Sequence, residues 1–215
     1  MIEERNEIRN FCLYSEDRNH RYLLARIWDE KKSIPLFISK CSGEADGIQL
    51  ELTNTLITNN LYALGYGGYY AVNLCSGIHG RTKEIKDKET DRIISEYAEK
   101  ASEIIISWGK LTTNILKERE SEVFKLLKSS KKKILSVSDS SGRTNLHILT
   151  PCVRNGFFLI EYNIKVSSHS QKKAEKTEKT FYQTIPHIIT CTVDFRQCMF
   201  AFLDFYPCIW YTNTP

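Results

Sequence analysis

The chain has 215 residues, of which 41% are hydrophobic, enough for one medium-sized core with an appendage rather than two full domains. Its net charge of +4, from 30 basic and 26 acidic side chains, is too small to indicate nucleic-acid binding by itself. The opening segment "MIEERNEIRNF" is polar throughout and lacks the apolar core of a signal peptide, which favours a cytoplasmic protein.

The seven cysteines are scattered along the chain and odd in number. They form no Cys-x-x-Cys pair and have no histidine at zinc-ligand spacing, so the sequence predicts no metal site. Reduced and mostly buried thiols are the simplest interpretation, and we expect no cofactor.

The first predicted elements are strands. Two apolar runs, 21–28 and 34–40, flank the polar segment "DEKKS" and predict a hairpin or two neighbouring strands. A helix is expected next, over 48–64, where apolar residues recur at helical spacing.

Both ends of that helix carry signals. Asp46 and Gln49 resemble a capping box before it, and Gly65 is a typical terminator after it. In the following "GYGGYYAVNL", the glycines come after a helix and before a strand at 70–74, the reverse of the order in a phosphate-binding glycine loop. We therefore interpret this stretch as the joint between the helix and the strand.

The alternation of helix and strand then continues. Helical spacing predicts helices over 87–101 and 112–130, and short apolar runs predict strands at 103–108 and 133–138. Helices between short apolar strands act as crossover connections, which produce a parallel sheet covered on both faces. The predicted fold class is therefore α/β, a three-layer α/β/α sandwich with a mostly parallel central sheet, spanning residues 14–161.

The C-terminal part has a different composition. Residues 162–180 are typical of a polar linker, and 181–215 of a small β-rich appendage with many aromatic residues. Its last apolar run is too short to cross a membrane and is interrupted by Asp204 and Pro207. We expect the appendage to be ordered from Phe181, because exposed runs this apolar are rarely tolerated, and to offer a surface for a protein partner.

Basic residues gather before the last predicted strand. Between positions 110 and 133 there are eight Lys or Arg against three Glu, ending in Lys131, Lys132 and Lys133. The run is typical of a solvated helix face and its exit turn; the alternative is a patch that contacts phosphate. Arg143, in the loop after the strand at 133–138, is a further candidate for a phosphate contact.

The predicted topology indicates where a site would lie. In an open parallel sheet, ligands bind outside the carboxyl ends of the strands, where loops and helix N-termini gather. This rule selects the loops after the predicted parallel strands. Those loops contain Ser42, Glu44, Asp46, Asn73, His79, Trp108 and His147.

Each main candidate has a structural alternative. Asn73 is either a turn former or a side-chain amide that reads the edge of a base. His147 is either a surface histidine or a donor to a developing anion. Asp46 fits a helix cap better than a general base, and Trp108 fits core packing better than a stacking platform, a role also open to Tyr66.

Four segments carry a family resemblance: "EDRNHRYLLARIWDEKKSIPLFISKCSGEAD", "LTNTLITNNLYALGYGGYYAVNL", "IIISWG" and "GRTNLHILTPCVRN". In their order and spacing, from about residue 14 to 161, they resemble a family of bacterial and phage proteins called domain of unknown function 1643. That family is in turn similar to the uracil-DNA glycosylase superfamily. Both resemblances imply an α/β/α sandwich with its site at the carboxyl ends of the strands.

The resemblance assigns roles to two residues. Asn73, which ends "AVN", matches the glycosylase asparagine that reads the pyrimidine edge. His147, in "LHILTP", matches the histidine that stabilises the departing base, although Ile148 stands where proline is usual.

The first loop departs from the family pattern. It typically reads Asn-Pro-Ser, and here Lys40, Cys41 and Ser42 occupy those positions. In the glycosylases this loop supplies the group that orients the attacking water, so the replacement argues against efficient hydrolysis. Ser42 also lacks a G-x-S-x-G setting, which argues against nucleophilic catalysis by its hydroxyl.

Two hypotheses of function follow. The first is a domain that recognises a nucleobase or nucleotide in a glycosylase-like pocket, with weak base excision at most; His147, Ser42 and Asp46 are its catalytic candidates. In that case the partner is a nucleotide or nucleic acid, and the protein does not bind a membrane. The second is a non-catalytic interaction module that kept the fold and lost the chemistry.

Overall fold

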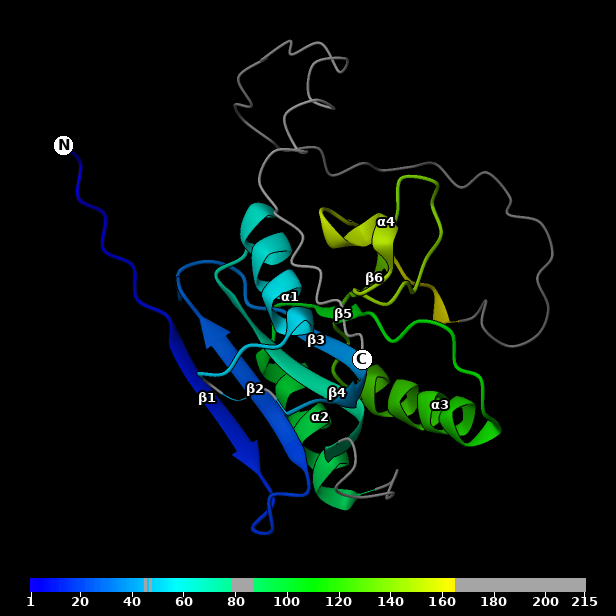
Figure 1. Ribbon diagram of the computed structural model, residues 1–215. Helices are drawn as coiled ribbons and strands as arrows, with labels where there is room; N and C mark the ends of the chain where they lie inside the picture. The colour runs from blue at the N-terminus through cyan, green and yellow to red at the C-terminus, as the bar shows by residue number, and fades with distance from the viewer. Residues whose placement is uncertain (45, 47, 79–86, 165–215) are drawn as a thin grey trace, which may run out of the picture. The chain divides into compact units, whose positions relative to one another are not determined.

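The computed structural model describes residues 1–44, 46, 48–78 and 87–164. The predicted appendage, nearly all of the predicted linker, and His79 lie outside these residues. In chain order the described part contains β1 (Arg9–Tyr14), β2 (Arg21–Ile27), β3 (Leu36–Ser42), α1 (Leu52–Ala63), β4 (Gly68–Ile78), α2 (Lys88–Lys100), β5 (Ile104–Ile106), α3 (Asn114–Ser129), β6 (Ile134–Ser138), α4 (Pro151–Arg154) and β7 (Phe158–Glu161) (Figure 1).

The strands form one mixed sheet in the order β1-β2-β4-β3-β5-β6-β7. The four central strands β4, β3, β5 and β6 are parallel to one another, as their helical connections require. The strands at the two edges are antiparallel to their neighbours. The α/β fold class is therefore confirmed for the described residues.

Two expectations about the sheet are wrong. The sheet is not mostly parallel, because in the described part three of its strand pairs are antiparallel. These pairs include β1 with β2, which a short connection joins, and β6 with β7, whose longer connection over 139–157 contains α4. The apolar runs 21–28 and 34–40 are also not paired with each other, because β4 inserts between β2 and β3.

Both faces of the central strands are buried. On β3, Leu36 and Ile38 pack with apolar side chains of α2 and α3, whereas Phe37 packs on the opposite face with those of α1. The alternation follows from the two-residue repeat of a strand. Figure 1 shows the corresponding arrangement, with α1 on one side of the sheet and α2 and α3 on the other.

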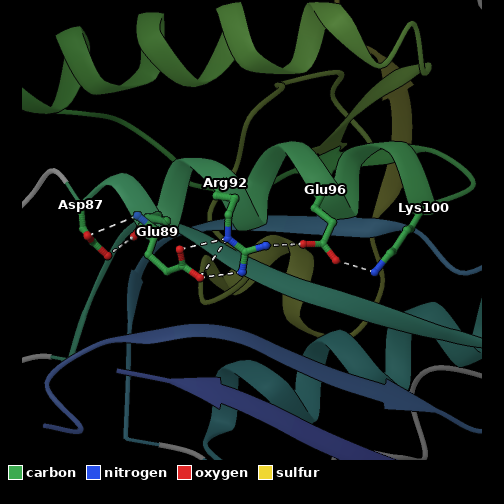
Figure 2. A network of polar contacts seen from close by, with 6 residues as sticks. Asp87, Glu89, Arg92, Glu96 and Lys100 are labelled. Atoms are coloured by element: carbon green, nitrogen blue, oxygen red, sulfur yellow. Dashed lines mark hydrogen bonds and ion pairs between the residues drawn. The ribbon is translucent and has the colours of Figure 1, made fainter. Parts of the chain in front are cut away.

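The helix α2 is held at its start and along its outer surface. The Asp87 side chain accepts a hydrogen bond from the backbone N–H of Glu89, which caps the first turn. Glu89, Arg92, Glu96 and Lys100 then form a row of ion pairs (Figure 2). Because these side chains are exposed, each pair adds only about 0.2–0.5 kcal/mol to helix stability.

A buried arginine joins the helical layer to the sheet. Arg119 of α3 is fully buried, and its Nε donates a 2.7 Å hydrogen bond to the carbonyl oxygen of Leu74. Its Nη1 lies 2.6 Å from a carboxylate oxygen of Asp91 on α2. One side chain therefore connects β4, α2 and α3 near the carboxyl end of β4.

The helix α1 begins later than the sequence predicts and ends as predicted. Its first residue is Leu52, with Glu51 at the N-cap, so Asp46 does not cap it. Asp46 instead accepts hydrogen bonds from the N–H groups of Ile48 and Gln49 in a separate turn. At the other end, Gly65 has a φ of +85°, which closes the last turn in the left-handed conformation.

Candidate functional site

A pocket forms where the carboxyl ends of β3 and β4 meet the start of α1 and the loop after β6. The two strands are parallel neighbours, with Ser39 opposite Asn73. The pocket encloses a cavity of about 40 Å³, room for a few water molecules. Its polar lining includes Arg21, Cys41, Glu51, Asn54, Asn73 and His147.

Asn73 is held in the pocket by Ser42. Asn73 is 5% exposed, and its Oδ1 lies 3.0 Å from the Ser42 hydroxyl, which donates to it. The Ser42 hydroxyl also lies 3.1 Å from the carbonyl oxygen of Arg21, so it is buried behind the asparagine rather than in the pocket lining. This bond uses Oδ1 and leaves the two Nδ2–H groups of this pocket-lining residue as its donors.

His147 is a neutral donor with a defined tautomer. Its Nδ1 accepts a 3.2 Å hydrogen bond from the backbone N–H of Leu149, so the ring proton lies on Nε2. Burial of the ring, and then the positive charge of Lys40, lower the pKa of His147 below its usual value. At neutral pH the imidazole therefore offers one N–H group and no charge.

A glycine lies directly against this histidine. Gly109 follows β5 with a φ of +69°, and a Cβ at this position would lie 3.0 Å from the Cβ of His147. The loop is further tied to the sheet by Ser107, whose hydroxyl donates to the carbonyl oxygen of Leu146 at 2.8 Å. The position of His147 therefore depends on the end of β5 as well as on its own loop.

Two of the other predicted site residues have structural roles. Trp108 is 1% exposed and belongs to the core on the α2 and α3 face, where its Nε1 donates to Glu120 at 2.8 Å. Its ring is not available for stacking on a ligand. Asp46 lies outside the pocket lining, and hydrogen bonds from the N–H groups of Gln49 and Ile48 lower its pKa, which makes it a poor general base.

Tyr66 and the lysines at 131–133 lie at the amino ends of the parallel strands, opposite the end that carries the pocket. Tyr66 precedes β4, and its hydroxyl donates to Glu103 at 2.5 Å just before β5. The lysines at 131–133 precede β6, where Lys133 lies 3.8 Å from Glu161. Residues that precede parallel strands gather at their amino ends, so neither group can share a ligand with Asn73.

Arg143 follows β6 and therefore lies at the carboxyl ends of the parallel strands, as the pocket does, but it is not in the pocket lining. Its guanidinium Nε and Nη2 bind the Asp139 carboxylate at 2.7 and 2.6 Å, and Nη2 also lies 3.3 Å from the sulfur of Cys152. Hydrogen bonds from Ser141 and Arg143 lower the pKa of Asp139, which keeps this carboxylate charged. Arg143 therefore orders the loop that leads to His147.

Comparison with known proteins places the chain in a family. The family model described as "Protein of unknown function (DUF1643)" matches residues 21–149. The chain belongs to this family. The DUF1643 match runs from the start of β2 to the His147 loop, so it contains every pocket residue named above. No curated protein and no solved structure matches the chain.

The DUF1643 pocket contains residues that the sequence did not single out, above all Arg21 and Asn54. Arg21 is 4% exposed and Asn54 is 3% exposed. For Asn54 a signal was present, because it precedes Ile57 and Leu61 at helical spacing and is thus a polar residue on the buried face of α1.

The described residues narrow the chemistry of the site. Among them, no group of three or more His, Cys, Asp or Glu side chains is arranged to hold a metal ion. In the same part of the chain, no helix combines the length and apolarity needed to cross a bilayer. The pocket combines the donor groups of Asn54, Asn73 and His147 with the Glu51 carboxylate, and the donors suit a ligand edge that carries acceptors.

Proposed function

We propose that this pocket recognises the edge of a nucleobase, free or as part of a nucleotide or nucleic acid. The observation that carries the proposal is that Asn73, fixed by Ser42, and His147, fixed as a neutral donor, line one pocket. The resemblance of the family to uracil-DNA glycosylases supports the same roles. The cavity admits only the polar edge of a base, so the sugar and any phosphate would remain outside it.

The same groups suit stabilisation of a departing base. When the bond between a base and its sugar breaks, the bonding electrons remain on the base, which becomes an anion. The hydrogen bond from a neutral Nε2–H group becomes stronger as negative charge develops on the base. The positive charge of the nearby Lys40 also favours that anion electrostatically. However, Lys40 also replaces the asparagine of the water-orienting loop, so we propose base recognition with weak excision or none.

Titration calorimetry with uracil, cytosine, hypoxanthine, adenine and their nucleoside monophosphates tests the proposal. The decisive variant is Asn73→Asp, which keeps an acceptor for the Ser42 hydroxyl and removes the amide N–H groups. We expect base binding to weaken by about 1–3 kcal/mol, the cost of losing a buried polar partner. Lys132→Ala, at the opposite edge, is the matched control and should bind as the wild type does.

The result has two clear alternatives. Equal binding by the wild type and a folded Asn73→Asp variant would refute base recognition by this residue. A loss of nucleotide binding only in Lys132→Ala would show phosphate recognition at the other edge instead. If excision of a base is detected, His147→Asn should lower its rate more than it weakens binding, because the proposed bond strengthens as charge develops.

A further inference from the structure

The side-chain nitrogen of Asn54 is buried without a partner. Asn54 lies in the first turn of α1 and is 3% exposed, and within the described residues its Nδ2 makes no hydrogen bond. Its backbone is in contrast well bonded, because its carbonyl oxygen accepts from the hydroxyls of Thr58 at 2.8 Å and Tyr69 at 3.3 Å. The missing hydrogen bond is therefore one of the side-chain nitrogen and not of the backbone carbonyl.

Such a donor is unfavourable for folding. Buried polar groups are almost always hydrogen-bonded, since an unpaired donor loses its bonds to water and gains none in return. An apolar residue would suit this face of α1, which continues with the fully buried Ile57 and Leu61. An amide kept at a cost to stability is typical of residues that act on a ligand.

A second asparagine of the same helix shows how a structural amide behaves. Asn60 is 7% exposed, and its Nδ2 donates to the carbonyl oxygens of Leu56 at 2.8 Å and Arg154 at 3.0 Å. The bond to Arg154 joins α1 to α4. Asn54 has the same side chain and similar burial, but it lines the pocket and its nitrogen has no such bonds.

Asn54 shares the pocket with two other donors. Asn73 has its Oδ1 occupied by Ser42, and the ring proton of His147 lies on Nε2. A ligand that satisfies all three must present several acceptor atoms, such as carbonyl oxygens or unprotonated ring nitrogens. Asn54 comes from α1, whereas Asn73 comes from the sheet, so they contact the ligand from different directions.

We propose that Asn54 is a second ligand-reading amide of this pocket, whose Nδ2 donates a hydrogen bond to an acceptor atom on the edge of the base. This inference rests on the proposed function and adds a requirement to it. The ligand must carry an acceptor at the position that faces α1. Bases with an exocyclic oxygen there bind, and bases with an amino group there leave two donors facing each other.

The test compares Asn54→Asp and Asn54→Ala with Asn60→Ala. Asn54→Asp keeps the shape of the side chain and replaces the donor with an acceptor. We expect both Asn54 variants to bind the best base of the uracil, cytosine, hypoxanthine and adenine series about tenfold to a hundredfold more weakly. Asn54→Ala should melt at or above the wild-type temperature, because it removes the unpaired donor. Asn60→Ala should melt lower and bind as the wild type does.

The outcomes separate this inference from the proposed function. If Asn73→Asp loses binding and the Asn54 variants do not, base recognition stands and the role of Asn54 is refuted. If Asn54→Ala lowers the melting temperature as much as Asn60→Ala, the amide is structural and the inference fails. A base that binds Asn54→Asp more tightly than the wild type would show that Asn54 accepts rather than donates. If the wild type binds no base, both proposals fall.

Discussion

Replacing Gly109 by alanine should move the pocket histidine without altering any group that faces the ligand. Gly109 has a φ of +69°, and an added Cβ would lie 3.0 Å from the Cβ and 3.4 Å from the backbone nitrogen of His147. A carbon–carbon contact of 3.0 Å is tighter than side chains normally make, so the histidine must shift by a few tenths of an ångström.

The expected loss of stability has two parts. An alanine in the left-handed conformation costs about 1–2 kcal/mol relative to glycine. The forced shift of the packed His147 loop adds about 1 kcal/mol, by comparison with other overpacked sites. The free energy of unfolding should therefore fall by about 2–3 kcal/mol in total.

Two other glycines serve as matched controls. Gly65 and Gly142 have φ values of +85° and +81°, and a Cβ at either would meet nothing within 4 Å. Their alanine variants should lose only the conformational part, about 1–2 kcal/mol. Urea unfolding measures the difference, and the imidazole resonances of His147 report its position. Equal losses in all three variants, with unmoved His147 resonances in Gly109→Ala, would refute the proposed contact.

Three further predictions concern the histidine, the buried arginine and the opposite edge of the sheet. Folding lowers the pKa of His147, so the unfolded chain binds a proton at this imidazole more tightly than the folded chain does. The free energy of unfolding should therefore fall as the pH drops below about 6.5. His147→Asn should lessen this fall in urea titrations. Arg119→Met should lower the free energy of unfolding by about 2–3 kcal/mol, because the buried carbonyl oxygen of Leu74 loses its charged donor. A smaller loss would mean that the surrounding residues relax around the methionine. Tyr66→Phe, which removes the hydrogen bond to Glu103, should cost about 1 kcal/mol in thermal unfolding and leave base binding unchanged; weakened binding would contradict the separation of the two edges.

Local patterns in the sequence determined most of the central architecture. Apolar periodicity indicated α2, α3 and the strands around Ile105 and Leu135, because both faces of these strands are buried and both helices have one apolar face. Gly65 marked the end of α1, since only glycine readily adopts the left-handed conformation found there. The order of helices and strands also determined that the carboxyl half of β4, which carries Asn73, and the His147 loop lie at the same end of the parallel strands.

The order of elements along the chain also determines where Tyr66 and the lysine run lie. Tyr66 and the lysines at 131–133 come before their strands, so the topology alone places them at the amino ends, away from the pocket. The resemblance to domain of unknown function 1643 was also visible in the sequence, and the family match over residues 21–149 bears out that part of it.

Only the tertiary structure decided the pairing of the edge strands, the side on which Trp108 lies and the different hydrogen bonding of Asn54 and Asn60. Edge pairing depends on segments far apart in the chain, and an all-apolar strand does not reveal which face each side chain takes. The Asn60 nitrogen finds carbonyl oxygens of Leu56 in α1 and of Arg154 in α4, whereas none of the described residues supplies one to the Asn54 nitrogen. Two asparagines of one helix thus differ in their hydrogen bonds because of what surrounds them in space.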